Sequence, residues 1–481
     1  MSNLNVDILY LIFKELEDDG NSLLSCLLVN KNWLNIIIPI LWKNPWKYLK
    51  EKINSKMILL KVIISHSSDE SRKNLENLLY FDFITYQKPF FKYISFCNHA
   101  DFHTIIDMIT SIFSSYATNI IVNEIINLFI NENMKFTHLY IPTEFNYKIH
   151  LISGFEHCFS ELEFLRCDLD NNNQNILKEL ARICKSIKNL GFRPSDSNIE
   201  INSIIKLIES QKELNSLCYL AYKVNESFRT SLEKSLIKHV NTLQYLEIND
   251  IPITKFLSYL NLISIELDGS GRATCWKNLE DVTLPHLKFL KAKYIPYEYL
   301  AKLIENTKGT LNEISIYSLR LNESNNERLI EAIARNCLNL KYLTLVLRNR
   351  DITGLEKLLI NCQYLNGLVI IPSLEESLFF WIKVFGMLIQ FSPIGLFKFK
   401  FYVLHINSFS QLQFLNLFFD KWKGRHPMLF QTVQMHINHS KLLEKVFKKI
   451  KKYKAEGIVK TYENDLHGNN YEEFEWIKKR I

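Results

Sequence analysis

A six-residue pattern, Leu-x-x-Leu-x-apolar, recurs through the middle of the chain and limits what the chain can fold into. Ten copies, in which other apolar residues sometimes replace leucine, begin at residues 136, 162, 187, 214, 243, 262, 287, 311, 340 and 365. Their spacing runs from 19 to 29 residues and averages about 25. A unit of this length cannot bury both of its faces alone, so neighbouring units must stack into an array.

The residues before several hexamers carry apolar side chains at three- and four-residue steps. Examples are Ile176–Cys184, Leu329–Cys337 and Leu355–Cys362. Each pattern predicts an amphipathic helix that is followed by a strand of alternating pattern. We therefore predict an α/β fold in which residues 136–440 form a curved solenoid. Parallel strands would line its concave face and helices its convex face. Generic helical repeats are the main alternative.

The repeat signal weakens beyond residue 371. Two further hexamers, LFKFKF at 396 and FQTVQM at 430, are candidates for additional strands. Ser440–Lys454 predicts a basic amphipathic helix, and eight lysines lie between residues 441 and 460. We expect residues 441–481 to form a charged capping helix and tail. A nucleic-acid-binding or membrane-surface helix is the alternative.

Composition excludes several classes of protein. Only 13 glycines and 11 prolines occur among 481 residues, which disfavours an all-β sandwich and long disordered linkers. The 58 Lys and Arg exceed the 51 Asp and Glu by only seven, too mild an excess for a dedicated nucleic-acid binder. Nine cysteines without a C-x-x-C pair indicate reduced thiols and a cytoplasmic or nuclear location. We expect neither a signal peptide nor a membrane span.

The first 46 residues predict three short helices. The first carries an apolar stripe of Val6, Leu9, Ile12, Phe13 and Leu16. The second covers Leu23–Val29 with Ser22 as its N-cap, and the third begins at Asn30 and is bent or ended by Pro39. So few residues cannot bury enough surface to be stable alone, so we expect a docking module covered by a partner. Residues 47–135 predict a helical linker and N-terminal cap that joins this module rigidly to the repeats.

The sequence here resembles the F-box family. That family's pattern begins Leu-Pro-x-Glu-Ile/Leu-Leu-x-x-Ile-Phe-x-x-Leu and ends on a helix that carries a Val and then a Trp. The matching residues are Leu4, Asp7, Ile8, Leu9, Ile12, Phe13, Leu16, Val29 and Trp33. Asn5 stands where the family has proline. The repeats in turn are similar to the Cys-containing leucine-rich repeats often found beside F-boxes, with Cys158, Cys184, Cys337 and Cys362 at the corresponding position.

The resemblance implies a partner. The F-box would dock on the Skp adaptor, which binds a cullin scaffold that carries the ubiquitin-conjugating machinery. The contact would bury apolar side chains in a groove, with Trp33, Phe13 and Leu9 as the main anchors. The expected Skp-adaptor-binding residues are Leu4, Ile8, Leu9, Ile12, Phe13, Leu16, Leu24, Leu27, Val29 and Trp33.

We therefore predict a non-catalytic, substrate-recruiting subunit of an SCF-type ubiquitin ligase, monomeric within a hetero-complex. Exposed residues of the repeat strands would bind an unidentified target protein: Glu163, Arg166, Lys188, Tyr245, Glu247, Lys288, Lys291, Lys341 and Tyr342. A binding scaffold that uses the same repeats without ligase assembly is the alternative.

No catalytic constellation, cofactor motif or nucleic-acid motif stands out in the sequence. Cys97, His99 and His103 have the types of a partial zinc site, but a fourth ligand is not evident nearby, so we expect no bound metal. A hydrolase or transferase would require a cluster of polar groups in a pocket.

Overall fold

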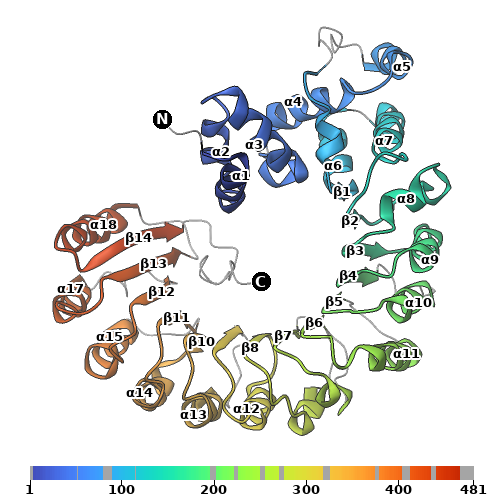
Figure 1. Cartoon of the computed structure of the whole chain (residues 1–481). Helices are drawn as coiled ribbons and strands as arrows, with labels where there is room; N and C mark the ends of the chain where they lie inside the picture. Colours follow the sequence, from blue (N-terminus) through green and yellow to red (C-terminus); the bar gives the residue numbers. More distant parts are fainter. Residues whose placement is uncertain are drawn as a thin grey trace. The chain divides into compact units, whose positions relative to one another are not determined.

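The computed structural model describes residues 4–50, 52–79, 89–113, 115–194, 202–220, 226–249, 255–269, 276–317, 326–373, 379–403, 412–434 and 440–465. The chain divides into two compact units (Figure 1). Unit 1 comprises Met1–Cys218 and Asn225–His239, and unit 2 comprises Tyr219–Val224 and Val240–Ile481.

Unit 1 begins with three helices, α1 (Val6–Glu15), α2 (Gly20–Cys26) and α3 (Lys31–Lys43). The prediction of three short N-terminal helices is therefore confirmed. Pro39 does not end the third helix, which continues to Lys43. The buried residues Ile38, Ile40 and Leu41 flank the proline, so packing compensates for the backbone hydrogen bond that proline cannot make.

Side-chain caps set the start of each of these helices. The side chains of Asn5, Asp19 and Asn30 accept hydrogen bonds from backbone N–H groups in the first turn of α1, α2 and α3. The prediction that Ser22 caps the second helix is wrong, because Asp19 accepts both the N–H and the hydroxyl hydrogen of Ser22. A carboxylate is favoured at this place by the positive end of the helix dipole.

Further helices separate this module from the repeats. These are the 3₁₀ helices η1 (Pro45–Tyr48) and η2 (Tyr93–Phe96), and the α-helices α4 (Ile53–Ile64), α5 (Asp69–Leu79), α6 (Phe102–Ile112) and α7 (Ser115–Phe129). A short strand, β1 (His99–Asp101), lies among them and pairs in parallel with β2. The range 47–135 therefore contains a strand as well as the predicted helices.

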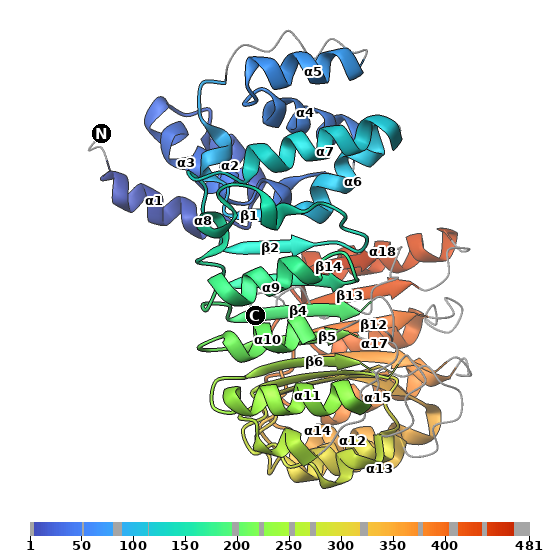
Figure 2. The same cartoon turned by 90° about the vertical axis from the view of Figure 1, so that its right-hand side faces the viewer.

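Unit 1 continues as parallel strands that alternate with helices. The strands are β2 (His138–Ile141), β3 (Phe164–Leu169), β4 (Asn189–Pro194) and β5 (Ser216–Leu220). The helices are η3 (Ile149–Leu151), α8 (Phe155–Phe159), α9 (Gln174–Ile183), α10 (Asn202–Ser210), α11 (Glu226–Leu236) and η4 (Ile237–His239). Neighbouring strands follow chain order, as Figure 2 shows for the stacked arrows of this unit.

Unit 2 repeats the same arrangement. Its strands are β6 (Tyr245–Asn249), β7 (Ser264–Asp268), β8 (Phe289–Lys293), β9 (Glu313–Tyr317), β10 (Tyr342–Leu347), β11 (Gly367–Pro372), β12 (Lys398–Val403), β13 (Met428–Gln434) and β14 (Val459–Asp465). Its α-helices are α12 (Tyr297–Asn306), α13 (Asn326–Asn336), α14 (Ile352–Asn361), α15 (Phe380–Phe391), α17 (Leu412–Lys421) and α18 (Ser440–Ala455). Each strand pairs in parallel with the next along the chain.

Three short 3₁₀ helices occur in the described part of unit 2. These are η5 (Lys255–Tyr259), η6 (Trp276–Asp281) and η7 (Asn349–Asp351), of which the last leads directly into α14. The other two, η5 and η6, stand where other repeats have an α-helix. The 19-residue repeat between the hexamers at 243 and 262 contains η5 as the one helix of its described residues. Fewer residues between two strands leave room only for the tighter and shorter helix.

The sequence hexamers correspond to the strands. Each of the ten hexamers overlaps one strand, from β2 to β11. The strand begins two residues after the first residue of its hexamer. The two weaker hexamers at 396 and 430 coincide with β12 and β13. The prediction of an α/β repeat array with parallel strands is confirmed. Strands β1 and β14 lie outside the predicted solenoid range, and β14 lies in the segment predicted as a charged tail.

Alternation along each strand separates two faces. In β3, the side chains of Leu165, Cys167 and Leu169 are buried on the helix side. Phe164 and Arg166 lie on the opposite side, which we call the open face. In Figure 1 the helices α12 to α15 lie along one side of the unit 2 strands. The apolar helix stripes pack there, and Leu180, Ile333 and Leu359 are fully buried.

Buried cysteines link neighbouring repeats. Cys158, Cys184, Cys337 and Cys362 are all buried. The thiols of Cys158, Cys184 and Cys362 donate to the backbone carbonyls of Asn131, Leu162 and Cys337, respectively. Each of these bonds reaches back 22 to 27 residues. The cysteine therefore serves a structural position that links one repeat to its predecessor.

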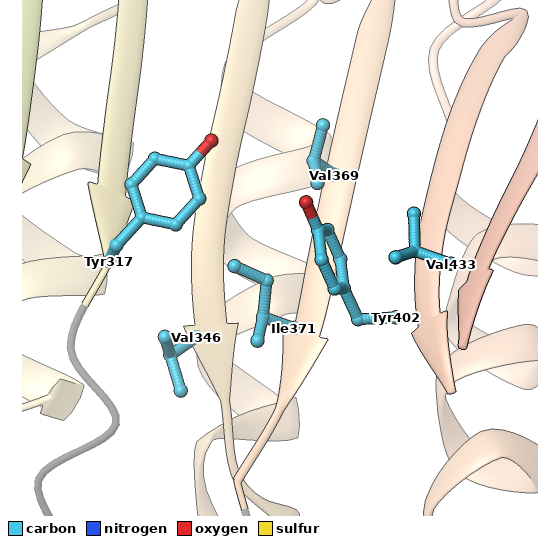
Figure 3. Packing of buried hydrophobic residues seen from close by; sticks show 6 residues of the cluster. All are labelled: Tyr317, Val346, Val369, Ile371, Tyr402 and Val433. Atoms are coloured by element: carbon cyan, nitrogen blue, oxygen red, sulfur yellow. The ribbon is translucent and has the colours of Figure 1, made fainter. Parts of the chain in front are cut away.

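Part of the open face of β9 to β13 is a buried apolar cluster, which lies beside buried polar side chains such as Thr344 and Lys400. Figure 3 shows the members of the cluster: Tyr317, Val346, Val369, Ile371, Tyr402 and Val433. None of these side chains is more than 5% exposed. Removing this area from water stabilises unit 2. A target protein cannot contact side chains that are already buried, so these six side chains do not offer a binding surface.

Candidate binding surfaces

The three-helix module has a core of its own. Leu9, Phe13 and Leu23 pack with residues of α3, and Phe13 is only 1% exposed. The ring of Trp33 meets that of Phe13 edge-on at 5.0 Å between centroids. The expectation that Leu9, Phe13 and Trp33 are the main docking anchors is wrong for Leu9 and Phe13, because both are already buried within the module. Trp33 is partly buried against the same core.

A second set of apolar side chains on the module points outward. Nine are between 44% and 89% exposed: Leu4, Val6, Ile8, Tyr10, Leu11, Ile12, Leu24, Leu28 and Val29. Five of them, Leu4, Ile8, Ile12, Leu24 and Val29, are among the expected adaptor-binding residues. Leu16 and Leu27 are partly buried against the core. We call the nine exposed residues the apolar patch.

Sequence reasoning did not include Leu28 among the docking residues, although it is the most exposed member of the apolar patch at 89%. It lies just beyond the end of α2, where the pattern of helical spacing gives no information about orientation. Exposed apolar side chains that gather on a surface often mark a contact site in soluble proteins, and this short module carries nine of them.

The module is fastened to the first repeat strand within unit 1. The backbone N–H of Asn98 donates to the carbonyl of Lys43 at 2.9 Å. The indole N–H of Trp46 donates to the carbonyl of His99 at 2.8 Å, and Trp46 is buried. Hydrogen bonds therefore connect the end of α3 and the η1 helix to the start of β1.

A stack of two histidine rings lies beside this junction. The ring centroids of His99 and His138 are 3.9 Å apart, on neighbouring strands in direct register. Burial lowers the pKa of His99 to about 3, with His138 and two nearby lysines contributing in the same direction. Burial also lowers the pKa of His138. Both rings are therefore neutral at physiological pH and act as packing surfaces.

The target-binding candidates fall into three positions of the hexamer. Glu163, Lys188, Lys288 and Lys341 directly precede a strand and are exposed at its start. Arg166 is exposed on the open face, and Tyr245, Glu247 and Lys291 are half-buried there. The prediction that Tyr342 is an exposed contact is wrong. Tyr342 is 7% exposed, and its hydroxyl accepts a hydrogen bond from the Lys398 ammonium at 3.0 Å.

Charged residues pair across neighbouring strands on the open face. Glu163 and Lys188 form an ion pair of 3.1 Å at the entrance to β3 and β4. In unit 2, Glu266 pairs with Lys291 at 2.9 Å and with Lys293 at 3.3 Å. Such partly exposed pairs contribute about 0–1 kcal/mol each. They define a polar open face over β6 to β8, in contrast to the apolar cluster of β9 to β13.

Two cavities lie along the strands of unit 1. A cavity of about 300 Å³ on the open face is lined by Asp101, Tyr140, Arg166, Asp168 and Arg193, among others. A larger hollow of about 510 Å³ lies at the strand entrances and includes Glu163, Lys188 and Lys212. Asp168 and Arg193 were missed in the sequence. Each lies two residues after the fifth residue of its hexamer and therefore on the same face of the strand, just beyond the hexamer itself.

Buried thiols in the described part of the chain are held in their protonated form. Burial raises the pKa of Cys97 to about 12, and its thiol donates to the carbonyl of His99. Burial likewise raises the pKa of Cys362 to about 12. Such thiols stay protonated and are poor nucleophiles. Across the described ranges, no group of three or more His, Cys, Asp or Glu side chains is arranged to hold a metal ion.

The helices of the described ranges include none that is both long and apolar enough to cross a membrane. Comparison with known protein families gives no match, and neither does comparison with curated protein sequences. One similar solved structure is the crystal structure of the Rad7 and Elc1 complex in yeast. The similarity has a TM-score of 0.37 at 12% identity and covers 61% of this chain and 76% of that chain. A similarity this weak does not assign a function.

Proposed function

We propose that this chain recruits target proteins to an SCF-type ubiquitin ligase. The three-helix module would dock on the Skp adaptor, and the open face of the repeats would hold the target. The chain itself would form or break no bond. It would raise the local concentration of target lysines near the conjugating enzyme, which is a proximity effect.

The observation that carries the proposal is the apolar patch. The module buries its own core and still exposes nine large apolar side chains. Burying one such side chain fully in a contact contributes ~1.5–3 kcal/mol. A groove that covers several of them would therefore supply enough free energy for a stable complex. The resemblance of the sequence to the F-box pattern favours the Skp adaptor as the partner.

The connection between module and repeats also supports the proposal. The Asn98–Lys43 hydrogen bond holds the end of α3 at the start of β1, and the Trp46–His99 hydrogen bond holds η1 there. A recruiting subunit needs its docking surface at a constant distance from its target-binding surface, because effective concentration depends on reach and stiffness. A scaffold without a fixed geometry would not require such contacts.

Co-expression with the Skp adaptor and affinity capture of the complex tests the proposal. The wild-type chain should capture the adaptor in equal amounts. Replacing Ile8 and Leu28 by aspartate together should lower the affinity at least about a hundredfold, because each change removes apolar contact and places a charge in it. Ile394→Asp in unit 2 is the control, since Ile394 is an apolar residue outside the apolar patch whose exposure of 87% matches that of Leu28.

The alternative is a binding scaffold that uses the same repeats without ligase assembly, and Asn5 in place of the family's proline keeps it open. Failure of the wild-type chain to capture the adaptor, with the chain folded, would favour this alternative. Capture that survives the Ile8→Asp and Leu28→Asp pair would mean that docking does not use the apolar patch.

A further inference from the structure

The open-face cavity of unit 1 combines two arginines and two aspartates, and their partners differ. Strand register places Tyr140, Arg166 and Gly191 side by side on β2, β3 and β4. Gly191 has no side chain to cover the aliphatic stem of Arg166, since a Cβ there would lie 3.6 Å from the Cγ of Arg166. Gly191 therefore leaves the stem of Arg166 uncovered on its β4 side, and Arg166 is exposed.

Both aspartates of the cavity are already engaged. Asp168 accepts two hydrogen bonds from the Arg193 guanidinium, at 2.7 and 3.1 Å. It also accepts one from the Thr143 hydroxyl at 2.9 Å. Asp101 caps α6 and accepts the N–H and the hydroxyl hydrogen of Thr104, both at 2.8 Å. The acceptor capacity of these carboxylates is directed into the protein.

Arg166 differs from its neighbours. Among the described residues it makes no hydrogen bond or ion pair, although its charge acts on Tyr140. Burial raises the pKa of the Tyr140 phenol and the charge of Arg166 opposes this shift. Tyr140 therefore keeps its hydroxyl hydrogen at neutral pH and can donate it. The unused groups of the cavity are donors, and the ligand that matches a planar guanidinium fork is an oxyanion.

We propose that this cavity binds an anionic group of the target, either a carboxylate or a phosphoryl group, with Arg166 as its principal ligand and Tyr140 as a second donor. The Arg193–Asp168 pair holds the rim and keeps the Asp168 charge neutralised. The proposal rests on the proposed function, because it assigns a ligand class to the face that would hold the target.

Small anions test this without the target and without the adaptor. The full chain, with labelled arginine, is titrated with phenyl phosphate and separately with benzoate, and binding is followed by the arginine Nε–Hε resonances. One resonance, identified as Arg166 by its loss in the Arg166→Gln variant, should shift saturably. Stronger binding of phenyl phosphate would indicate a phosphorylated target residue, and stronger binding of benzoate an acidic one. Both results support the proposal.

Variants sharpen the test. Arg166→Gln should weaken binding at least about tenfold, because a charge-assisted fork is lost. Arg166→Lys should lie between this variant and wild type, and Asp168→Asn should tighten binding, because it removes a negative charge from the cavity. Arg335→Gln, which removes an exposed helix-surface guanidinium paired with Glu331, is the control. Absence of saturable binding, equal binding by Arg166→Gln, or equal loss in the control would each overturn the proposal and leave adaptor docking untouched.

Discussion

The substitution Phe13→Ala separates a core role from a contact role in the three-helix module. Phe13 is 1% exposed and meets Trp33 edge-on. Removing a buried phenylalanine ring leaves a cavity and typically costs ~3–5 kcal/mol. Every 1.4 kcal/mol is a factor of ten in an equilibrium constant, so local opening of the module should increase by roughly two to four powers of ten. Replacing Ile8, which is 47% exposed, leaves no such cavity and does not carry this cost.

Hydrogen exchange of the amides of α1, α2 and α3 measures this opening directly. We expect Phe13→Ala to accelerate their exchange strongly, while Ile8→Asp leaves it unchanged and still impairs adaptor capture. The reasoning would be refuted if Phe13→Ala kept wild-type protection throughout the module and lost only capture. Phe13 would then be a contact residue, as the sequence pattern alone suggested.

Other substitutions test the packing of the repeats. Gly154 has a φ of +93°, and a Cβ there would lie 2.6 Å from the backbone of Asn131, so Gly154→Ala should lower the thermal midpoint, with a cost of ~1–3 kcal/mol. Gly386→Ala should raise the free energy of unfolding by ~0.5–1 kcal/mol, because Gly386 lies within α15 with no atom near the added methyl group. In the unfolded chain His99 binds a proton below about pH 6.5, whereas in the native state its ring stays neutral down to about pH 3. Native stability should therefore fall as pH drops through that window. Unfolding titrations should show that wild type loses roughly 1 kcal/mol more than His99→Phe between pH 7 and pH 5.

The repeat architecture could be predicted because it depends on local pattern. A strand needs alternating burial, and the hexamers supplied this at regular spacing, so each strand from β2 to β11 begins two residues into its hexamer. Strand β1 has only three residues, and β14 reads VKTYEND without the leucine spacing. Backbone hydrogen bonds to the neighbouring strand hold them, and such bonds leave no signature in side-chain pattern.

The binding surfaces were harder to predict because orientation is a tertiary property. An apolar stripe on a short helix does not tell which residues face the module's own core, and Leu9 and Phe13 turned out to do so while Ile8 and Leu28 face outward. On the strands, Asp168 follows from the same alternation as Arg166. Its role, however, depends on Arg193, which lies 25 residues away and is adjacent only through strand register.

Hydrogen exchange of the full chain with and without the purified Skp adaptor shows where the adaptor docks. Adding the adaptor should slow exchange in residues 4–16 and 24–29, where the apolar patch lies. Exchange in the strands β2 to β12 should stay as it was. No change in the three-helix module at saturating adaptor, or protection confined to the repeats, would contradict docking through the apolar patch.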